Sequence, residues 1–278
     1  MGVPSIVDCA GKLLDLSQPK VMGILNITPD SFSDGGDFLS FDLAMKQAQR
    51  MVEEGVAIID VGGESTRPGA QSVTEAEELD RVIPVIEGIA KNLAVPISID
   101  TSKPNVMKAA VAAGAGMIND VQALRVSGAI EAVADLKVPV CLMHMQGKPR
   151  TMQEKPCYGD VLSEVKSFLS QRVNCCIAAG IPREQLLIDP GFGFGKSLDH
   201  NLVLLRGLQE FSGLGLPVLV GVSRKSMIGE LLDEPADRRM FGGLAAAVLA
   251  AERGARLIRT HDVKPTVDAL AVTAAIAL

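Results

Sequence analysis

Stretches of apolar, mostly β-branched residues that end at a polar residue recur about eight times along the chain. They occupy residues 21–28, 57–63, 96–102, 116–121, 138–144, 186–191, 217–223 and 256–262. Hydrophobic residues in these stretches are continuous rather than alternating, as in parallel strands that are covered on both faces. The pattern therefore predicts about eight parallel β-strands.

Segments with helical spacing lie between the predicted strands, at residues 43–55, 73–93, 105–114, 164–180 and 242–254. Most of them end in Gly, the usual helix terminator. No linker or shift in composition divides the chain, so residues 1–278 are predicted to form a single domain. This alternation favours a (β/α)8 TIM barrel, with a short N-terminal β-hairpin over residues 5–16. A doubly wound open sheet is the structural alternative.

The composition is that of a globular protein, with 47% hydrophobic and 22% charged residues. The longest apolar run, residues 244–251, is far shorter than the roughly 20 residues that span a bilayer, so no membrane segment is expected. The net charge is −6 and no basic cluster is present, which argues against a nucleic-acid partner. We therefore expect a small-molecule ligand.

Cysteine usage and the N-terminus predict a cytoplasmic protein. The first residues lack the basic segment and apolar stretch of a secretory signal. The five Cys form no C-x-x-C pair, and an odd number suits a reducing compartment better than a disulfide framework.

Nearly every predicted strand ends at a side chain that can ionise or form hydrogen bonds. These ends are Asn26, Asp60 with Gly62 and Gly63, Asp100, Asn119 with Asp120, His144, Asp189, Ser223, and Arg259 with His261. Each residue alone is more often a turn or N-cap residue than a functional one. In a barrel, however, the carboxyl ends of all strands meet at one mouth, where active sites lie. Their joint occurrence predicts an active site there.

The residue types at these ends indicate two kinds of ligand group. Carboxylates and a carboxamide (Asp100, Asn119, Asp189) can bind the hydrogen-bonding edge of a purine, pyrimidine or pterin. Arg259 and His261, after the last strand, can bind an anionic group. The glycine-rich residues 190–197 do not match a nucleotide-binding motif, and no zinc or serine-nucleophile motif appears. A Mg²⁺ ion held largely by substrate phosphate and water stays possible.

Eight loop motifs in order along the chain resemble the dihydropteroate synthase family. They are GILNITPDSFSDGG, DVGGESTRPGA, SIDTSKP, GAGMINDV, LMHMQGKPRTMQ, IDPGFGFGKSLDHNLVLLR, LVGVSRKSMIG and RTHDV. The resemblance covers essentially the whole chain. It implies a (β/α)8 barrel that condenses 6-hydroxymethyl-7,8-dihydropterin diphosphate with 4-aminobenzoate, by loss of diphosphate and attack of the arylamine.

The resemblance also implies roles for individual residues. The pterin site would comprise Asp100, Asn119, Met143, Asp189, Lys225 and Arg259. The diphosphate site would comprise Asn26, Arg67, Arg259 and His261, and Mg²⁺ would bind Asn26. The 4-aminobenzoate site would comprise Thr66, Pro68, Phe194 and Ser223. Asp100, Lys225, Arg259 and His261 would act in catalysis, and the protein would be a homodimer.

Some positions and alternatives are left open. Lys148, Arg150 and His144 lie within the motifs but receive no role. Residues 28–36 are expected to form a loop that closes over the diphosphate. A pterin-dependent methyltransferase and a non-catalytic paralogue are the alternative functions. The complete set of motifs argues against the paralogue.

Overall fold

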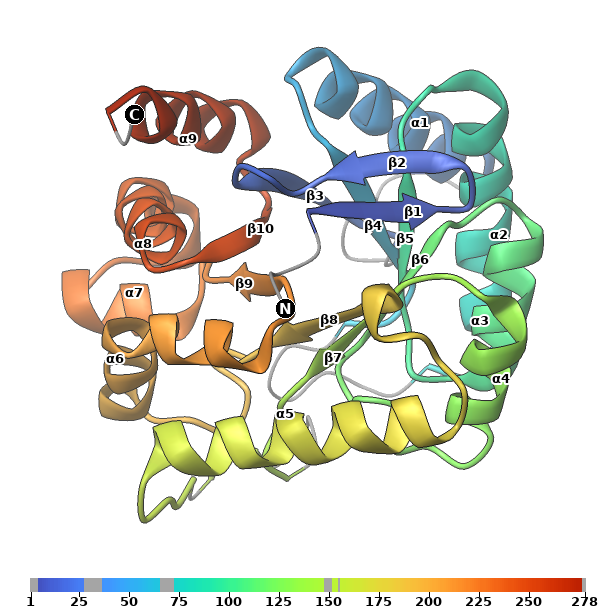
Figure 1. The fold of residues 1–278 in the computed structure, drawn as a ribbon. Coiled ribbons are helices and arrows are strands. Elements are labelled where there is room, and N and C mark those ends of the chain that lie inside the picture. The colour runs from blue at the N-terminus through green and yellow to red at the C-terminus, as the bar shows by residue number, and fades with distance from the viewer. Residues whose placement is uncertain (1–4, 28–36, 66–72, 148–151, 155, 277–278) are drawn as a thin grey trace.

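The computed structural model describes residues 5–27, 37–65, 73–147, 152–154 and 156–276, with only the backbone for residues 37–40. Within these residues, eight parallel strands close into a barrel in the order β10-β3-β4-β5-β6-β7-β8-β9 (Figure 1). The strands are β3 (Lys20–Asn26), β4 (Ile58–Gly62), β5 (Ile97–Asp100), β6 (Met117–Asp120), β7 (Val140–Met143), β8 (Leu186–Asp189), β9 (Val218–Gly221) and β10 (Ala255–Thr260). The predicted barrel is confirmed. The open sheet is wrong, because β10 pairs with β3 and leaves no edge.

Helices follow the strands and cover the outside of the barrel (Figure 1). They are α1 (Asp37–Glu53), α2 (Glu75–Asn92), α3 (Pro104–Ala112), α4 (Ala129–Leu136), α5 (Val161–Ala178), α6 (Leu198–Arg206), α7 (Ser226–Leu232), α8 (Met240–Glu252) and α9 (Val263–Ile276). The described residues also contain the short 3-10 helices η2 (Arg183–Gln185), η3 (Leu208–Leu214) and η4 (Ala236–Arg238). None of the helices that the structure describes is long and apolar enough to cross a membrane.

Outward-facing strand residues form one hydrophobic core with the helices. Ile59, Ile99 and Val140 are fully buried in it. Burying such a side chain contributes about 1.5–3 kcal/mol. Because both faces of each strand are covered, the sequence shows continuous apolar runs at these positions.

Inward-facing strand residues form two layers of different polarity. Near the amino end the barrel is filled by Met22, Ile58, Met117, Cys141, Leu187, Leu219 and Leu257. Two residues further along the same strands, the inward positions are polar at Asp60, Asn119, Asp189 and Arg259. Side chains along a strand point inward at every second residue, so each polar residue stands above an apolar one. The functional end of the barrel is therefore the carboxyl end.

The predicted N-terminal hairpin is also confirmed, as β1 (Ile6–Cys9) and β2 (Lys12–Asp15). Its buried residues Val7, Leu14 and Leu16 join the apolar layer inside the barrel. Figure 1 shows the hairpin lying across the barrel. The hairpin closes the amino end with apolar side chains and leaves the polar mouth at the opposite end.

Candidate active site

Arg259, on β10, is held between two buried carboxylates inside the barrel. Its Nε donates to Asp60 Oδ2 over 2.6 Å, and its Nη2 donates to Asp100 Oδ2 over 2.7 Å. Charge-assisted hydrogen bonds of this length are about twice as strong as neutral ones. Nη1 makes no hydrogen bond to any residue that the structure describes. The guanidinium is therefore fixed through Nε and Nη2, and its Nη1 can donate to a ligand.

Asp60 also fixes the side chain of Asn119. The Asn119 Nδ2 donates to Asp60 Oδ2 over 3.1 Å, so its Oδ1 is left as an acceptor. The strand register places Asn119 next to Asp100, and Asp100 next to Gly62. Asp60 is fully buried, and its Oδ1 has no hydrogen-bond partner among the described residues. It thus connects two of the predicted site residues, although the sequence marked it only as a strand end and gave it no role.

The buried charges shift one another's pKa values. Burial raises the pKa of Asp100 to about 7, against the opposing charge of Arg259. Burial likewise raises the pKa of Asp189, against the charge of Lys225. For Arg259, burial disfavours the charge, but Asp60 and Asp100 outweigh it and raise the pKa, so the guanidinium stays charged.

Lys225 stands at the N-cap of α7, and its ammonium contacts the loop after β8. Nζ donates to the carbonyl of Phe192 and lies 4.6 Å from the centre of the Phe194 ring, in a cation–π contact. Burial lowers the pKa of Lys225 to about 8, while the charge of Asp189 opposes that change. The predicted residues Phe194 and Lys225 are thus in direct contact.

Ser223 and His261 form a second pair at this end. Ser223 Oγ lies 3.0 Å from His261 Nδ1 and accepts a 3.2 Å hydrogen bond from the His261 backbone N–H. The neighbouring Arg224 forms an ion pair with Asp262 over 2.5 Å, and its side chain is 40% exposed. The pair ties the loop after β9 to the loop after β10 and so supports the Ser223–His261 contact.

Met143 belongs to a small apolar cluster at the carboxyl end. It packs with Val121, Met145 and Met152, and Phe194 lies against the cluster. Flexible methionines adapt to flat ligands and interact favourably with aromatic rings. The cluster gives this end of the barrel one apolar wall beside its polar groups.

Asn26 lies at the end of β3, next to Gly62 of β4, which in turn lies next to Asp100 of β5. A Cβ placed on Gly62 would lie 3.6 Å from both Asn26 Oδ1 and Asp100 Cβ, so the glycine leaves the space between them open. Across the described residues, no group of three or more His, Cys, Asp or Glu could hold a metal. Any cation bound at Asn26 would therefore need most of its ligands from substrate and water.

Several predicted residues lie outside the described residues. They are Thr66, Arg67 and Pro68, together with Lys148, Arg150 and the loop over residues 28–36.

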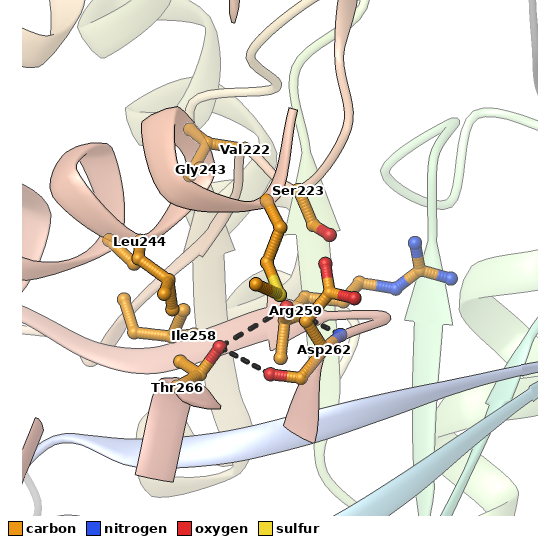
Figure 2. Close-up of a pocket in the computed structure, with 11 residues that line it drawn as sticks. Val222, Ser223, Gly243, Leu244, Ile258, Arg259, Asp262 and Thr266 are labelled. Carbon is orange, nitrogen blue, oxygen red and sulfur yellow. Dashed lines mark hydrogen bonds between the residues drawn. The ribbon is translucent and has the colours of Figure 1, made fainter. Parts of the chain in front are cut away.

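A small cavity lies next to this site and shares Ser223 and Arg259 with it. Figure 2 shows Leu244, Thr266 and other lining residues from α8, α9 and β10 around it. Thr266 Oγ1 donates to the Asp262 carbonyl over 2.7 Å and closes one side. The Arg259 guanidinium points away from these residues (Figure 2). The ion pairs inside the barrel, not this cavity, mark the candidate active site.

Comparisons with known proteins agree with this geometry. A family model described as "Pterin binding enzyme" matches residues 22–261. Dihydropteroate synthase of Escherichia coli K12 is 57% identical over 265 residues, which are 95% of this chain and 94% of the relative. A structure of Xanthomonas albilineans dihydropteroate synthase with 4-aminobenzoic acid has 55% identity and a TM-score of 0.94, covering 99% of both chains.

A second structure of the Xanthomonas albilineans enzyme, in complex with 7,8-dihydropteroate, has 52% identity and a TM-score of 0.90, covering 98% of both chains. The likeness thus extends over the barrel, the hairpin and the polar mouth. This chain belongs to the pterin-binding enzyme family and, within it, to the dihydropteroate synthases.

Proposed function

We propose that this chain is a dihydropteroate synthase, a transferase that condenses 6-hydroxymethyl-7,8-dihydropterin diphosphate with 4-aminobenzoate. The products are 7,8-dihydropteroate and diphosphate. The observation that carries the proposal is the Arg259 guanidinium, held by Asp60 and Asp100 inside the barrel, with Nη1 making no hydrogen bond to the described residues. The relatives, one of them 57% identical, support the same reaction.

The polar groups at the mouth suit one edge of a pterin ring. Asp189 and the Asn119 Oδ1 are acceptors for ring N–H and amino groups, whereas the Lys225 ammonium is a donor for the ring carbonyl. The apolar cluster around Met143 supplies a surface for the ring face. Acceptors, a donor and an apolar wall together select a flat heterocycle with a mixed edge.

The reaction requires charge stabilisation rather than a nucleophilic side chain. The bond between the pterin methylene carbon and the diphosphate oxygen breaks, and its electron pair leaves with diphosphate. The methylene cation is delocalised into the pterin until the arylamine nitrogen forms the new C–N bond and releases a proton to water. Arg259 and His261 bind the leaving charge, and the ionised Asp100 stabilises the cation. Fixed donors of this kind lower a barrier by several kcal/mol.

The residues present fit Mg²⁺, although they form no closed protein site. The Asn26 Oδ1 accepts no hydrogen bond from the residues that the structure describes, and it borders the open space at Gly62, across from Asp100. Mg²⁺ typically takes one or two protein oxygens and completes its shell with phosphate oxygens and water. When bound, the ion would supply positive charge for the leaving diphosphate.

The proposal is tested by incubating purified protein with both substrates and Mg²⁺. Diphosphate is followed by a coupled assay and dihydropteroate by chromatography. We expect equal amounts of both products, and neither product when the pterin diphosphate is omitted. Folded protein, checked by circular dichroism, that forms neither product would refute the function.

We also propose a cytoplasmic homodimer. The five cysteines are free thiols, in keeping with a reducing compartment.

Phe241 on α8, together with Val272 and Ile276 on α9, is 61–79% exposed, an unusual position for large apolar side chains. The two helices pack side by side, so these residues suit a contact with a second copy. Light scattering should give twice the chain mass and Phe241→Glu the monomer mass, whereas a monomeric wild type would contradict the dimer.

A further inference from the structure

Lys196, in the loop after β8, is buried and lies among acceptors without a carboxylate partner. Its side chain is 3% exposed. Its Nζ lies 2.9 Å from His144 Nδ1 and donates to the carbonyls of Gly191 over 2.8 Å and Phe194 over 3.1 Å. Within the part of the chain that the structure describes, no ion pair involves Lys196. A buried amine is costly unless its hydrogens are bonded, so this arrangement is a specific one.

His144 is the acceptor that completes this arrangement. Burial lowers the pKa of Lys196 to about 7. In its ammonium form Lys196 only donates, so Nδ1 then accepts and the ring proton sits on Nε2. Burial and the charge of Lys196 lower the pKa of His144 to about 3, which keeps the imidazole neutral. The ring packs edge-on against Phe168, with 4.9 Å between the ring centres. His144 therefore anchors Lys196 to the end of β7.

The loop that Lys196 holds is pressed tightly against the segment after β7. Gly191 has φ +70°, and a Cβ there would lie 1.9 Å from the His144 carbonyl oxygen. Gly195 has φ +63°, and a Cβ there would lie 2.4 Å from the Gln146 carbonyl oxygen. Only glycine fits both the backbone angle and the space. Close packing therefore confines the backbone of this loop to one conformation. Lys196 donates to carbonyls near both ends of the loop.

The same loop presents the two groups that orient Lys225. The Phe192 carbonyl accepts from Lys225 Nζ, and the Phe194 ring lies 4.6 Å from that ammonium. Both groups lie between the carbonyls that Lys196 binds. We propose that Lys196 is a positioning residue, which sets the Gly191–Phe194 loop so that Lys225 points at the pterin. The inference rests on the proposed function, because it concerns binding of the pterin diphosphate.

Binding of the pterin diphosphate alone, measured by calorimetry without 4-aminobenzoate, tests this role. Lys196→Met keeps the apolar stem and removes the ammonium. We expect its dissociation constant to rise roughly 10- to 100-fold, as expected when the hydrogen bond from the Lys225 ammonium to the pterin is lost. Tyr158→Phe is the matched control, because it removes a 2.8 Å hydrogen bond to Gly195 of the same loop and leaves the Lys196 contacts intact. It should change the dissociation constant by less than ~3-fold.

A double-mutant cycle with Lys225→Met separates positioning from general weakening of the fold. If Lys196 acts through Lys225, then Lys196→Met should change affinity little once Lys225 is absent. Effects that multiply in the double variant would overturn the proposal, as would wild-type affinity in a folded Lys196→Met. If Lys196→Met does not fold, Lys196→Gln goes through the same cycle under the same criteria. Turnover by the wild type tests the proposed function separately, since the cycle measures binding alone.

Discussion

Asp60→Asn probes the charge network of the active site with almost no change in shape. In the wild type, Asp60 Oδ2 accepts from Arg259 Nε over 2.6 Å and from Asn119 Nδ2 over 3.1 Å. An Asn side chain can place its amide oxygen at the same point and keep both hydrogen bonds. The substitution therefore removes one negative charge and leaves the packing in place.

The cost in stability follows from the loss of charge in the bond to Arg259. A hydrogen bond to a charged group contributes about 1.5–3 kcal/mol, against about 0.5–1.5 kcal/mol for a neutral one. We therefore expect Asp60→Asn to lower the free energy of unfolding by roughly 1–2 kcal/mol. Deleting the group as Asp60→Ala would cost more, about 3–5 kcal/mol, because Arg259 would lose a buried partner outright.

The effect on activity has a defined sign. Burial raises the pKa of Asp100 to about 7, Arg259 opposes this rise, and the charges of Asp60, Glu78 and Asp120 add to it. Removing the Asp60 charge takes away a repulsion and leaves Arg259 with Asp100 as its one carboxylate partner. Both changes lower the pKa of Asp100. Because the ionised form stabilises the cation, the acid limb of kcat/KM should move to lower pH.

The assay is a pH profile of kcat/KM for the pterin diphosphate, together with urea unfolding. Ser98→Ala is the control, since Ser98 is the neighbour of Asp60 in the strand register and its buried Oγ makes no hydrogen bond within the described part of the chain. It should leave the profile in place. An acid limb that stays fixed in Asp60→Asn, or moves to higher pH, would refute the electrostatic reasoning.

Three further predictions follow from other parts of the molecule. Asn26→Ala should abolish the stimulation by Mg²⁺ without lowering the melting temperature, and an unchanged Mg²⁺ titration would reject Asn26 as a ligand. Leu16→Ala should lower the free energy of unfolding in urea by about 2–5 kcal/mol and leave both KM values unchanged, because the hairpin closes the far end of the barrel. The folded state holds the Asp100 proton up to pH of about 7, whereas its ordinary pKa is 3.8, so unfolding free energy should fall with rising pH between these values. Asp100→Asn should flatten that slope, and an unchanged slope would contradict the pKa assignment.

The barrel could be predicted because each strand is covered on both faces and therefore appears in the sequence as one continuous apolar stretch. The site could be predicted in part for a related reason. Residues such as Asp100 and Asp189 interrupt those runs at the carboxyl end, where a purely structural strand would stay apolar. The structure places Asp100, Asn119, Asp189 and Arg259 inside the barrel at that end. Their roles toward substrate stay predictions.

The sequence did not reveal which polar residues hold the others in place. Asp60 was noted at a strand end, but its contact with Arg259 joins residues 199 positions apart. Side chains along a strand alternate between its two faces, so Asp60, two residues before Gly62, could have been assigned to the same inward face as Gly62. Nothing comparable was available for Lys196, because a lysine after a glycine-rich stretch looks like a solvated charge. Its burial results from the path of the whole loop.

The charges of the inner side chains give an independent reason to expect a cation with the substrate. Above pH 7, when Asp100 is ionised, two carboxylates, Asp60 and Asp100, contact the single positive charge of Arg259. The diphosphate is also anionic, so moving it to this mouth against a negative site would be unfavourable. Positive charge must therefore arrive with it. Mg²⁺ is suited to that role because it binds phosphate oxygens directly and needs only one or two protein oxygens, such as Asn26 Oδ1.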